Sequence, residues 1–342
     1  MKELELKQLE REILEGKSID KVIEEAKKNM NDERVGEQLG LKTRFSGLNN
    51  AMNKYFRFSH VTEIAGASGS GKSYLLNILE EDFFDDGVGG LNADFPHEKL
   101  LLSFKFEMDG ADEVIRTVSR KMGRSYNYML SSEYVGKDTY NTLTEAEYQE
   151  ALRHLEKMKG KPIMYFEKMG TWKDILSTIK YYYYKFPNKK LIVTLDHSLL
   201  TKKAKYEAGV LDTIQNLAVA AIMARKFYGC MVIILGQLNS NIESTDRRTK
   251  YDLHYPIKSD IYAQAQLYWA CDNVFVLHRP ELLGITRYGT SKLFTTDLAH
   301  LICIKSRKGR TGNVWLESRL GESTFRQVNG DYFKQDRKKD LL

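Results

Sequence analysis

The stretch GASGSGKS, from Gly66 to Ser73, fits the pattern G-x-x-x-x-G-K-[ST]. Its glycines let successive backbone N–H groups curl around a polyphosphate, and the positive end of a following helix faces the same anion. Lys72 is expected to reach the β- and γ-phosphates of a nucleotide, and Ser73 to offer its hydroxyl to Mg²⁺. The predicted phosphate-binding residues are Gly66, Ala67, Ser68, Gly69, Ser70, Gly71, Lys72 and Ser73.

The residues on either side of this loop supply the context that the motif requires. VTEIAG before it is apolar and strand-like, and SYLLNILEEDFF after it has helical spacing. A complete match between a strand and a helix argues against a chance glycine- and serine-rich loop. Nucleotide binding is therefore predicted, while a kinase, a GTPase, a helicase and a recombinase all remain open.

Polar side chains stand at the ends of three other apolar, strand-like runs. Asp196 ends LIVTLD and is expected to hold Mg²⁺ through water, opposite Ser73. Glu107 ends LLSFKFE, either as a base that deprotonates an attacking water or as a surface glutamate before a turn. Gln237 ends MVIILGQ, where a neutral amide could sense the γ-phosphate and signal to the loop behind it.

Two basic segments suggest contacts beyond the nucleotide. The loop after Gln237 is long and polar and carries Arg247, Arg248 and Lys250, so it either tracks a nucleic-acid backbone or is simply solvated. Lys305 and Arg307, in IKSRKGRTG, point the same way if they lie on a strand. They are either arginine-finger groups that reach a neighbour's nucleotide or part of a basic β-hairpin turn.

Composition is that of a globular protein, with 42% hydrophobic and 29% charged residues among 342. No apolar run is long enough to span a bilayer, and the charged N-terminus does not resemble a secretory signal, so no membrane partner is expected. The three cysteines lie far apart in apolar stretches, which indicates reduced core residues and a reducing compartment. A net charge of +6 weakly favours a polyanionic partner.

The order of predicted elements indicates an α/β fold with a mostly parallel sheet flanked by helices. Residues 1–40 are expected to form a helical arm, with Ser18 as a helix N-cap, that packs on its own domain or docks on a neighbouring subunit. Residues 41–330 are expected to form the main domain and 331–342 a flexible tail. The predicted strands are Val61–Ala65, Leu100–Phe106, Pro162–Phe166, Leu191–Leu195, Met231–Leu235, Asn273–Leu277 and His300–Lys305; the main helices are Ala111–Met122, Glu145–Met158, Trp172–Phe186 and Asp212–Tyr228.

Six segments, taken in order, resemble the C-terminal ATPase domain of DnaB-family replicative helicases, within the RecA-like class. They are GASGSGKS; FKFEM, similar to S-L-E-M; LDHSLL, similar to D-Y-L-Q-L; GQLNSNIE, similar to S-Q-L-N-R; SDIYAQAQLYWACDNVFVLHRPE, similar to the S-D-L-R-E-S-G, A-D and Y-R-D-E run; and IKSRKGRTG, similar to K-x-R-x-G. The resemblance covers most of the chain, from FSGLNNAMN to STFRQV.

This resemblance implies a role for each of the open positions. Glu107 is then the catalytic base, Gln237 the sensor, and Lys305 and Arg307 fingers that act across a subunit boundary. The family forms a ring, usually a hexamer, that encircles single-stranded DNA and translocates with ATP and Mg²⁺. A docking N-terminal helix, a primase or helicase loader as partner, and a cytoplasmic location are also implied.

The chain departs from the family pattern in two respects. It has no room for the family's larger N-terminal domain, which interacts with primase; a short form of this kind would suit a bacteriophage. Tyr262 replaces the arginine of S-D-L-R-E-S-G, and Ala263 and Ala265 replace its glutamate and glycine. DNA contact is therefore expected either to have moved to basic residues elsewhere, namely Lys202, Lys203, Arg247, Arg248 and Lys250, with Tyr262 kept as a candidate contact, or to be weakened.

The predicted function is a ring-forming, ATP-dependent DNA helicase motor that translocates on single-stranded DNA and unwinds duplex during replication. A RecA-like recombinase or recombination mediator, which would form a filament, is one alternative. A regulatory or assembly ATPase that has kept the fold without unwinding is a second, and a small-molecule P-loop kinase is a third.

Overall fold

The computed structural model describes residues 16–131 and 142–335 of the chain. The chain divides into two compact units, Met1–Leu39 and Gly40–Leu342. Within the described residues, no helix is both long enough and apolar enough to cross a membrane.

The first unit contains helix α2, Ile19–Arg34. Its N-terminus is capped as predicted, because Ser18 Oγ accepts a hydrogen bond from the Lys21 amide at 3.3 Å. The helix buries none of its side chains. The helical spacing predicted over residues 4–14 lies outside the described residues.

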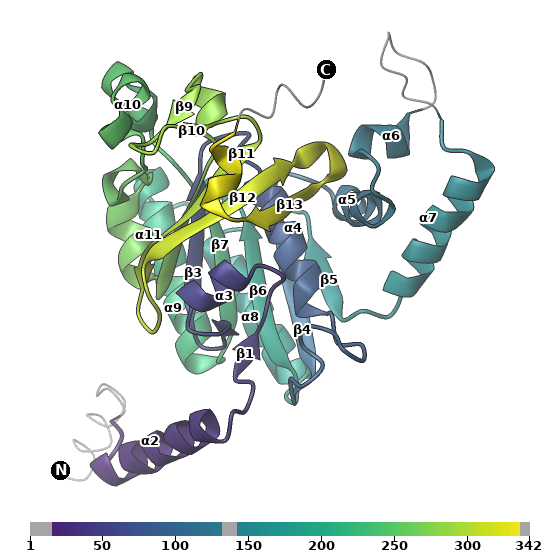
Figure 1. The fold of residues 1–342 in the computed structure, drawn as a ribbon. Coiled ribbons are helices and arrows are strands. Elements are labelled where there is room, and N and C mark those ends of the chain that lie inside the picture. Colours follow the sequence, from purple (N-terminus) through teal and green to yellow (C-terminus); the bar gives the residue numbers. More distant parts are fainter. Residues whose placement is uncertain (1–15, 132–141, 336–342) are drawn as a thin grey trace, which may run out of the picture. The chain divides into compact units, whose positions relative to one another are not determined.

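The second unit is organised around a central sheet, which has nine strands within the described residues, in the order β13-β12-β11-β8-β3-β7-β6-β4-β5 (Figure 1). The six strands from β8 to β5 are parallel, and β11, β12 and β13 continue the sheet in antiparallel pairing. Their bounds are β3 Val61–Gly66, β4 Lys99–Lys105, β5 Ile163–Phe166, β6 Lys190–Asp196, β7 Met231–Gln237, β8 Asn273–His278, β11 Leu298–Ser306, β12 Gly312–Arg319 and β13 Thr324–Val328.

Helices cover both faces of this sheet (Figure 1). One core holds Ile64 of β3 and the inner side chains of α4, and the other holds Val61 and Ala65 with those of α8, α9 and α11. Alternate residues of β3 thus enter different cores, and all six residues of the strand are buried. The helices are α3 Ser46–Ala51, α4 Lys72–Phe83, α5 Gly110–Met122, α6 Tyr126–Leu130, α7 Glu145–Met158, α8 Trp172–Lys185, α9 Val210–Phe227, α10 Thr245–Thr249 and α11 Gln264–Ala270.

The predicted α/β class is confirmed, and each of the seven predicted strands is present with small shifts at its ends. Sequence reasoning missed β12 and β13, and also two short ribbons, β1 (Gly40–Leu41) with β2 (Phe56–Arg57) and β9 (Arg287–Tyr288) with β10 (Leu293–Phe294). The three cysteines are free and buried, as expected.

The sheet has two edges that matter for function. The P-loop edge is defined here by the carboxyl ends of the parallel strands, where β3 runs into the loop Gly66–Ser73. The opposite edge, where these strands begin, is called the finger edge, because β11 runs antiparallel to β8 and ends there, with Ser306 paired to Asn273. Ligands of such sheets bind at the carboxyl ends, so the nucleotide site is sought at the P-loop edge.

Candidate nucleotide site

The loop Gly66–Ser73 connects β3 to α4 through backbone that requires glycine. Gly69 and Gly71 have φ angles of +73° and +92°. At Gly66, a Cβ atom would lie 2.7 Å from both the Leu277 carbonyl oxygen and Ser70 Oγ. Side chains at these positions would strain or crowd the loop, so the glycines are fixed by its geometry.

The ammonium group of Lys72 lies inside the loop. Its Nζ donates to the carbonyl oxygens of Gly66 and Ala67, at 2.9 and 2.8 Å. Burial lowers the pKa of Lys72 to about 8, against the opposing effect of the Asp196 and Glu107 carboxylates. A bound polyphosphate would replace the two carbonyls as acceptors and would favour the charged form.

Asp196 and Ser73 fit the role of Mg²⁺ ligands. Asp196 ends β6 at the P-loop edge and is 2% exposed, and its Oδ1 has no hydrogen-bond partner among the described residues. A buried carboxylate oxygen without a donor suits a cation or a cation-bound water. Ser73 lines the cavity at the loop, and the described residues hold no cluster of three or more His, Cys, Asp or Glu that would make a separate metal site.

Glu107 follows β4 at the same edge and keeps its carboxylate accessible. The side chain is 54% exposed, and its Oε2 lies 3.7 Å from Nε2 of His197. Burial lowers the pKa of His197, with Glu107 and Asp196 opposing, so the imidazole is expected to be neutral near pH 7. An exposed carboxylate beside a neutral imidazole can accept a proton from water.

Sequence reasoning missed Arg116, on α5. Its guanidinium is 8% exposed, lines the same cavity as Lys72 and Glu107, and stacks over the Tyr74 ring at 4.3 Å. Nη1 donates to Glu113 Oε1 at 3.0 Å, while Nε has no partner among the described residues. Arg116 therefore brings a second cationic side chain, besides Lys72, to this cavity, and its position three residues after Glu113 was the available signal.

Gln237 ends β7, lines the nucleotide cavity and is joined directly to the basic loop behind it. Its carbonyl oxygen accepts from the Tyr262 amide at 2.8 Å, and Leu238 bridges Ile261. The Tyr262 side chain is exposed. The backbone of Gln237 is thereby bonded to the region where DNA contact was predicted.

The basic residues of this loop differ in how far they are engaged. Arg247 holds the loop itself, because its Nη2 donates to Asp260 Oδ2 at 2.8 Å and to the Tyr255 carbonyl at 2.6 Å. Arg248 Nε donates to the Leu283 carbonyl at 2.8 Å. We therefore assign Arg247 a structural role, while DNA contact by Arg248 and Lys250 stays a prediction.

Lys305 and Arg307 lie at the finger edge, away from the P-loop of their own chain. Lys305 Nζ donates to the Tyr268 carbonyl at 2.6 Å, and Arg307 Nη1 donates to Asp272 Oδ1 at 3.0 Å. The other oxygen of Asp272 accepts from the amide of Val61, the first residue of β3. The segment leads into the β11–β12 hairpin, as the β-hairpin interpretation expected, and the finger role of Lys305 and Arg307 stays a prediction.

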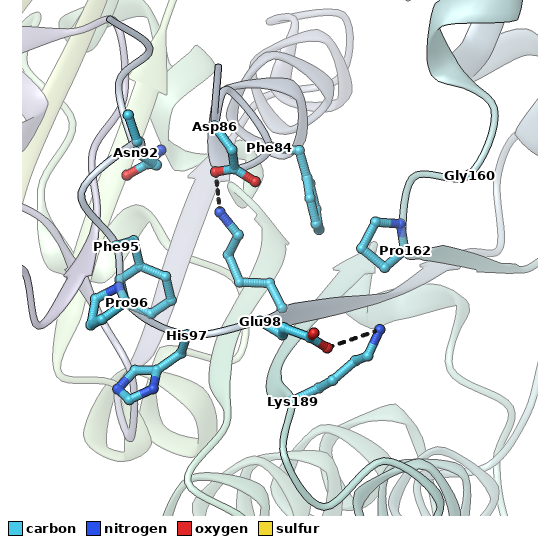
Figure 2. A pocket seen from close by; sticks show the side chains of 12 residues that line it. Phe84, Asp86, Asn92, Phe95, Pro96, His97, Glu98, Gly160, Pro162 and Lys189 are labelled. Atoms are coloured by element: carbon cyan, nitrogen blue, oxygen red, sulfur yellow. Dashed lines mark hydrogen bonds and ion pairs between the residues drawn. The ribbon is translucent and has the colours of Figure 1, made fainter. Parts of the chain in front are cut away.

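A second cavity, of about 490 Å³, lies at the finger edge and not at the nucleotide site. Figure 2 shows Phe84, Phe95 and Pro162 around it. The Lys99 ammonium within it is paired with Asp86 and lies 5.5 Å from the ring centroids of Phe84 and Phe95. The cavity has no glycine loop or helix N-terminus to hold phosphate, so we place the nucleotide at the smaller cavity by the P-loop, of about 160 Å³.

Similar folds occur among solved structures. The ATPase domain of G40P superposes with a TM-score of 0.72 at 19% sequence identity, covering 92% of this chain and 100% of that one. A DnaB-like replicative helicase, described with its interactions with primase, gives a TM-score of 0.70 at 19% identity, over 95% of this chain and 71% of that one. A comparison with curated protein sequences finds no match.

The strand order, the P-loop and the carboxylates at the strand ends define a RecA-like ATPase fold. The family model of the DnaB-like helicase C-terminal domain matches residues 40–327. The chain therefore belongs to the family of DnaB-like helicase C-terminal domains.

Proposed function

We propose that this protein is the motor of a ring-forming DNA helicase that hydrolyses ATP, with Mg²⁺, to translocate on single-stranded DNA and unwind duplex. Family membership supports a helicase, and the position of the finger residues supports catalysis between subunits.

The observation that carries the proposal is the separation of Arg307 from its own P-loop. Arg307 is held at the beginning of β3, because Asp272 accepts hydrogen bonds from both Arg307 and the Val61 amide. The P-loop begins at Gly66, at the other end of the same strand. The five residue steps of β3 correspond to roughly 17 Å, which is longer than an arginine side chain. In a ring of identical subunits, Arg307 therefore serves the nucleotide of a neighbour.

Within the completed site, each residue has a defined task. Lys72 and the loop amides bind the phosphates, Ser73 and Asp196 hold the cation, and Mg²⁺ when bound neutralises charge on the β- and γ-phosphates. Glu107 orients water and accepts its proton. Lys305 and Arg307 of the next subunit stabilise the negative charge that develops on the transferred phosphoryl group.

The remaining parts of the motor are assigned by the same proposal. Helix α2 exposes Ile19, Val22, Ile23 and Met30, and an apolar set of this kind on an arm suits docking on the neighbouring subunit. Gln237 couples hydrolysis to the loops that contact DNA. A primase or a helicase loader is proposed as a protein partner.

The test is ATP hydrolysis by the purified protein, with and without single-stranded DNA, for the wild type, Glu107→Gln and Arg307→Ala. Strong stimulation by DNA is expected in the wild type. Glu107→Gln should lower the rate by about 10²–10⁴-fold, and Arg307→Ala by about 10³-fold or more, while both variants still bind a fluorescent ATP analogue.

Arg310→Ala is the matched control, because Arg310 is an exposed arginine in the same segment and its side chain has no assigned task. It should hydrolyse ATP as the wild type does. A forked-duplex assay then tests unwinding. If single-stranded DNA does not change the rate of ATP hydrolysis, the helicase proposal is wrong and a regulatory ATPase of the same fold is favoured instead.

A further inference from the structure

The structure brings two aromatic rings together at the P-loop edge of the sheet. Trp172 is the first residue of α8, and Tyr206 lies in the loop that connects β6 to α9. The indole Nε1 of Trp172 donates a hydrogen bond to the Tyr206 hydroxyl at 2.9 Å. Tyr206 is 60% exposed, whereas Trp172 is half-buried and packs in part against the core beneath it.

The loop that carries Tyr206 is held in place on both sides. Glu207 is 4% exposed, and its carboxylate accepts from the Ala204 amide and the Thr213 hydroxyl, at 2.7 and 2.8 Å. The Lys202 amide donates to the Gly170 carbonyl at 2.9 Å, which ties the loop to the turn before Trp172. The two rings therefore form a surface whose geometry is fixed before a ligand arrives.

The surroundings of the rings are strongly basic. Lys173 lies 5.5 Å from the Trp172 ring centroid and 4.7 Å from that of Tyr206. The two segments that carry the rings, residues 168–174 and 201–207, contain five lysines against two carboxylates, and both carboxylates accept hydrogen bonds within these segments. The lysines, all of them exposed, are Lys168, Lys173, Lys202, Lys203 and Lys205.

Rigid aromatic faces among exposed lysines match the chemistry of a single nucleic-acid strand, whose bases stack while its phosphates meet cations. We propose that Trp172 and Tyr206 form a stacking platform for a base of single-stranded DNA, and that Lys202, Lys203 and Lys205 contact the neighbouring phosphates. This inference rests on the proposed function and assigns it a base-contacting site.

The platform is also close in sequence to the nucleotide site. A single 3-10 turn, Ser198–Leu200, separates Asp196 and His197 from the loop that carries Tyr206. Both rings lie at the P-loop edge, since β5 and β6 end there in parallel with β3. A change in the contacts of Asp196 therefore reaches the platform through a short, ordered segment.

The test compares binding of a labelled oligodeoxythymidine with binding of an abasic strand of the same length, both by fluorescence anisotropy. Wild-type protein should bind the base-containing strand more tightly. Tyr206→Ala should weaken that binding about 5- to 100-fold and leave the abasic strand unchanged, because only base stacking is lost. Trp172→Ala should behave in the same way.

Two controls separate stacking from other effects. Tyr206→Phe keeps the ring and loses only the hydroxyl, so it should discriminate between the strands as the wild type does. Lys203→Ala should weaken binding of both strands and reduce the salt dependence by about 0.7 in log–log slope. Thermal melting verifies that each variant is folded.

The outcomes distinguish this inference from the proposed function. In one outcome, Tyr206→Ala and Trp172→Ala bind the oligodeoxythymidine as tightly as the wild type does. That result would overturn the stacking platform but leave the proposed helicase function intact. If the wild type binds neither strand, the DNA function itself is overturned and the platform with it.

Discussion

The carboxyl group of Glu63 lies in the middle of the central sheet without a hydrogen-bond partner among the described residues. The residue is 1% exposed, and a Cβ atom at Gly236 would lie 2.4 Å from its Oε1. Burial raises the pKa of Glu63 to about 8, although the Lys305 ammonium opposes the shift. Glu63 is thus mostly protonated at neutral pH, and Gly236 is required beside it.

Glu63 should make the stability of the protein depend on pH. Its folded pKa lies above its unfolded value, so its contribution to stability is complete below the unfolded pKa and is lost as the pH rises through about 8. Glu63→Gln should remove this slope and stabilise the protein at alkaline pH, by roughly a few kcal/mol at most. Urea unfolding from about pH 6 to about pH 9 measures the effect; wild-type and variant curves that stay parallel would contradict it.

At the scale of elements, a buried ion network joins the helix that holds the phosphates to the strand that leads to Glu107. Lys105 of β4 is 1% exposed, and its Nζ lies 3.2 Å from Glu80 Oε2 on α4 and 3.1 Å from Glu113 Oε2 on α5. Burial alone would lower the pKa of Lys105, but the two carboxylates outweigh it and raise the pKa above its usual range. The strand that leads to Glu107 and the helix that follows the P-loop are therefore positioned by one set of charges.

Replacing Lys105 by methionine should destabilise the fold by about 3–5 kcal/mol, because the buried Glu80 would lose the cation that pairs with it and Glu113 would be left with Arg116 alone. The triple variant Lys105→Met/Glu80→Gln/Glu113→Gln removes all three charges and should recover part of that loss. Denaturant unfolding of both variants gives the comparison. Equal stability of wild type and Lys105→Met would show that the network does not hold these elements together.

A feature could be predicted from the sequence when the residues that form it are close together along the chain, and not when they come from separate elements. The six parallel strands, β11 and the Ser18 cap are encoded by neighbouring residues, so they could be predicted from the sequence, whereas β12 and β13 were missed. The network around Lys105 could not, because its members come from three separate elements and each looks like an ordinary surface charge in the sequence. The pairing of Trp172 with Tyr206 was missed for the same reason, and the finger role of Arg307 came from family resemblance, not from spacing.

At the scale of the whole molecule, the proposed function divides the nucleotide site between two subunits. The proposal places the P-loop of one subunit against Arg307 of the next. Lys72→Ala and Arg307→Ala then inactivate different halves of the same site.

Mixing these two inactive proteins should restore ATP hydrolysis. In a randomly mixed ring, about a quarter of the interfaces would combine an intact P-loop with an intact finger. The measurement is the ATPase rate after subunit exchange between the two variants. Lys72→Ala mixed with the double variant Lys72→Ala/Arg307→Ala is the control and should remain inactive. Failure of the first mixture to recover activity, despite proven exchange, would mean that the finger does not act in trans.

In the proposed assembly, the placement of Arg307 and the P-loop at opposite edges of one sheet also determines the symmetry. Two different surfaces meet at each contact, so the subunits associate head to tail and no two-fold axis relates them. A pair of subunits built in this way completes one site and leaves an unused finger at one end and an unfinished site at the other. Every finger and every site is used only when the subunits close into a ring. If the rotation between neighbouring subunits does not close, the same contact produces a helical filament.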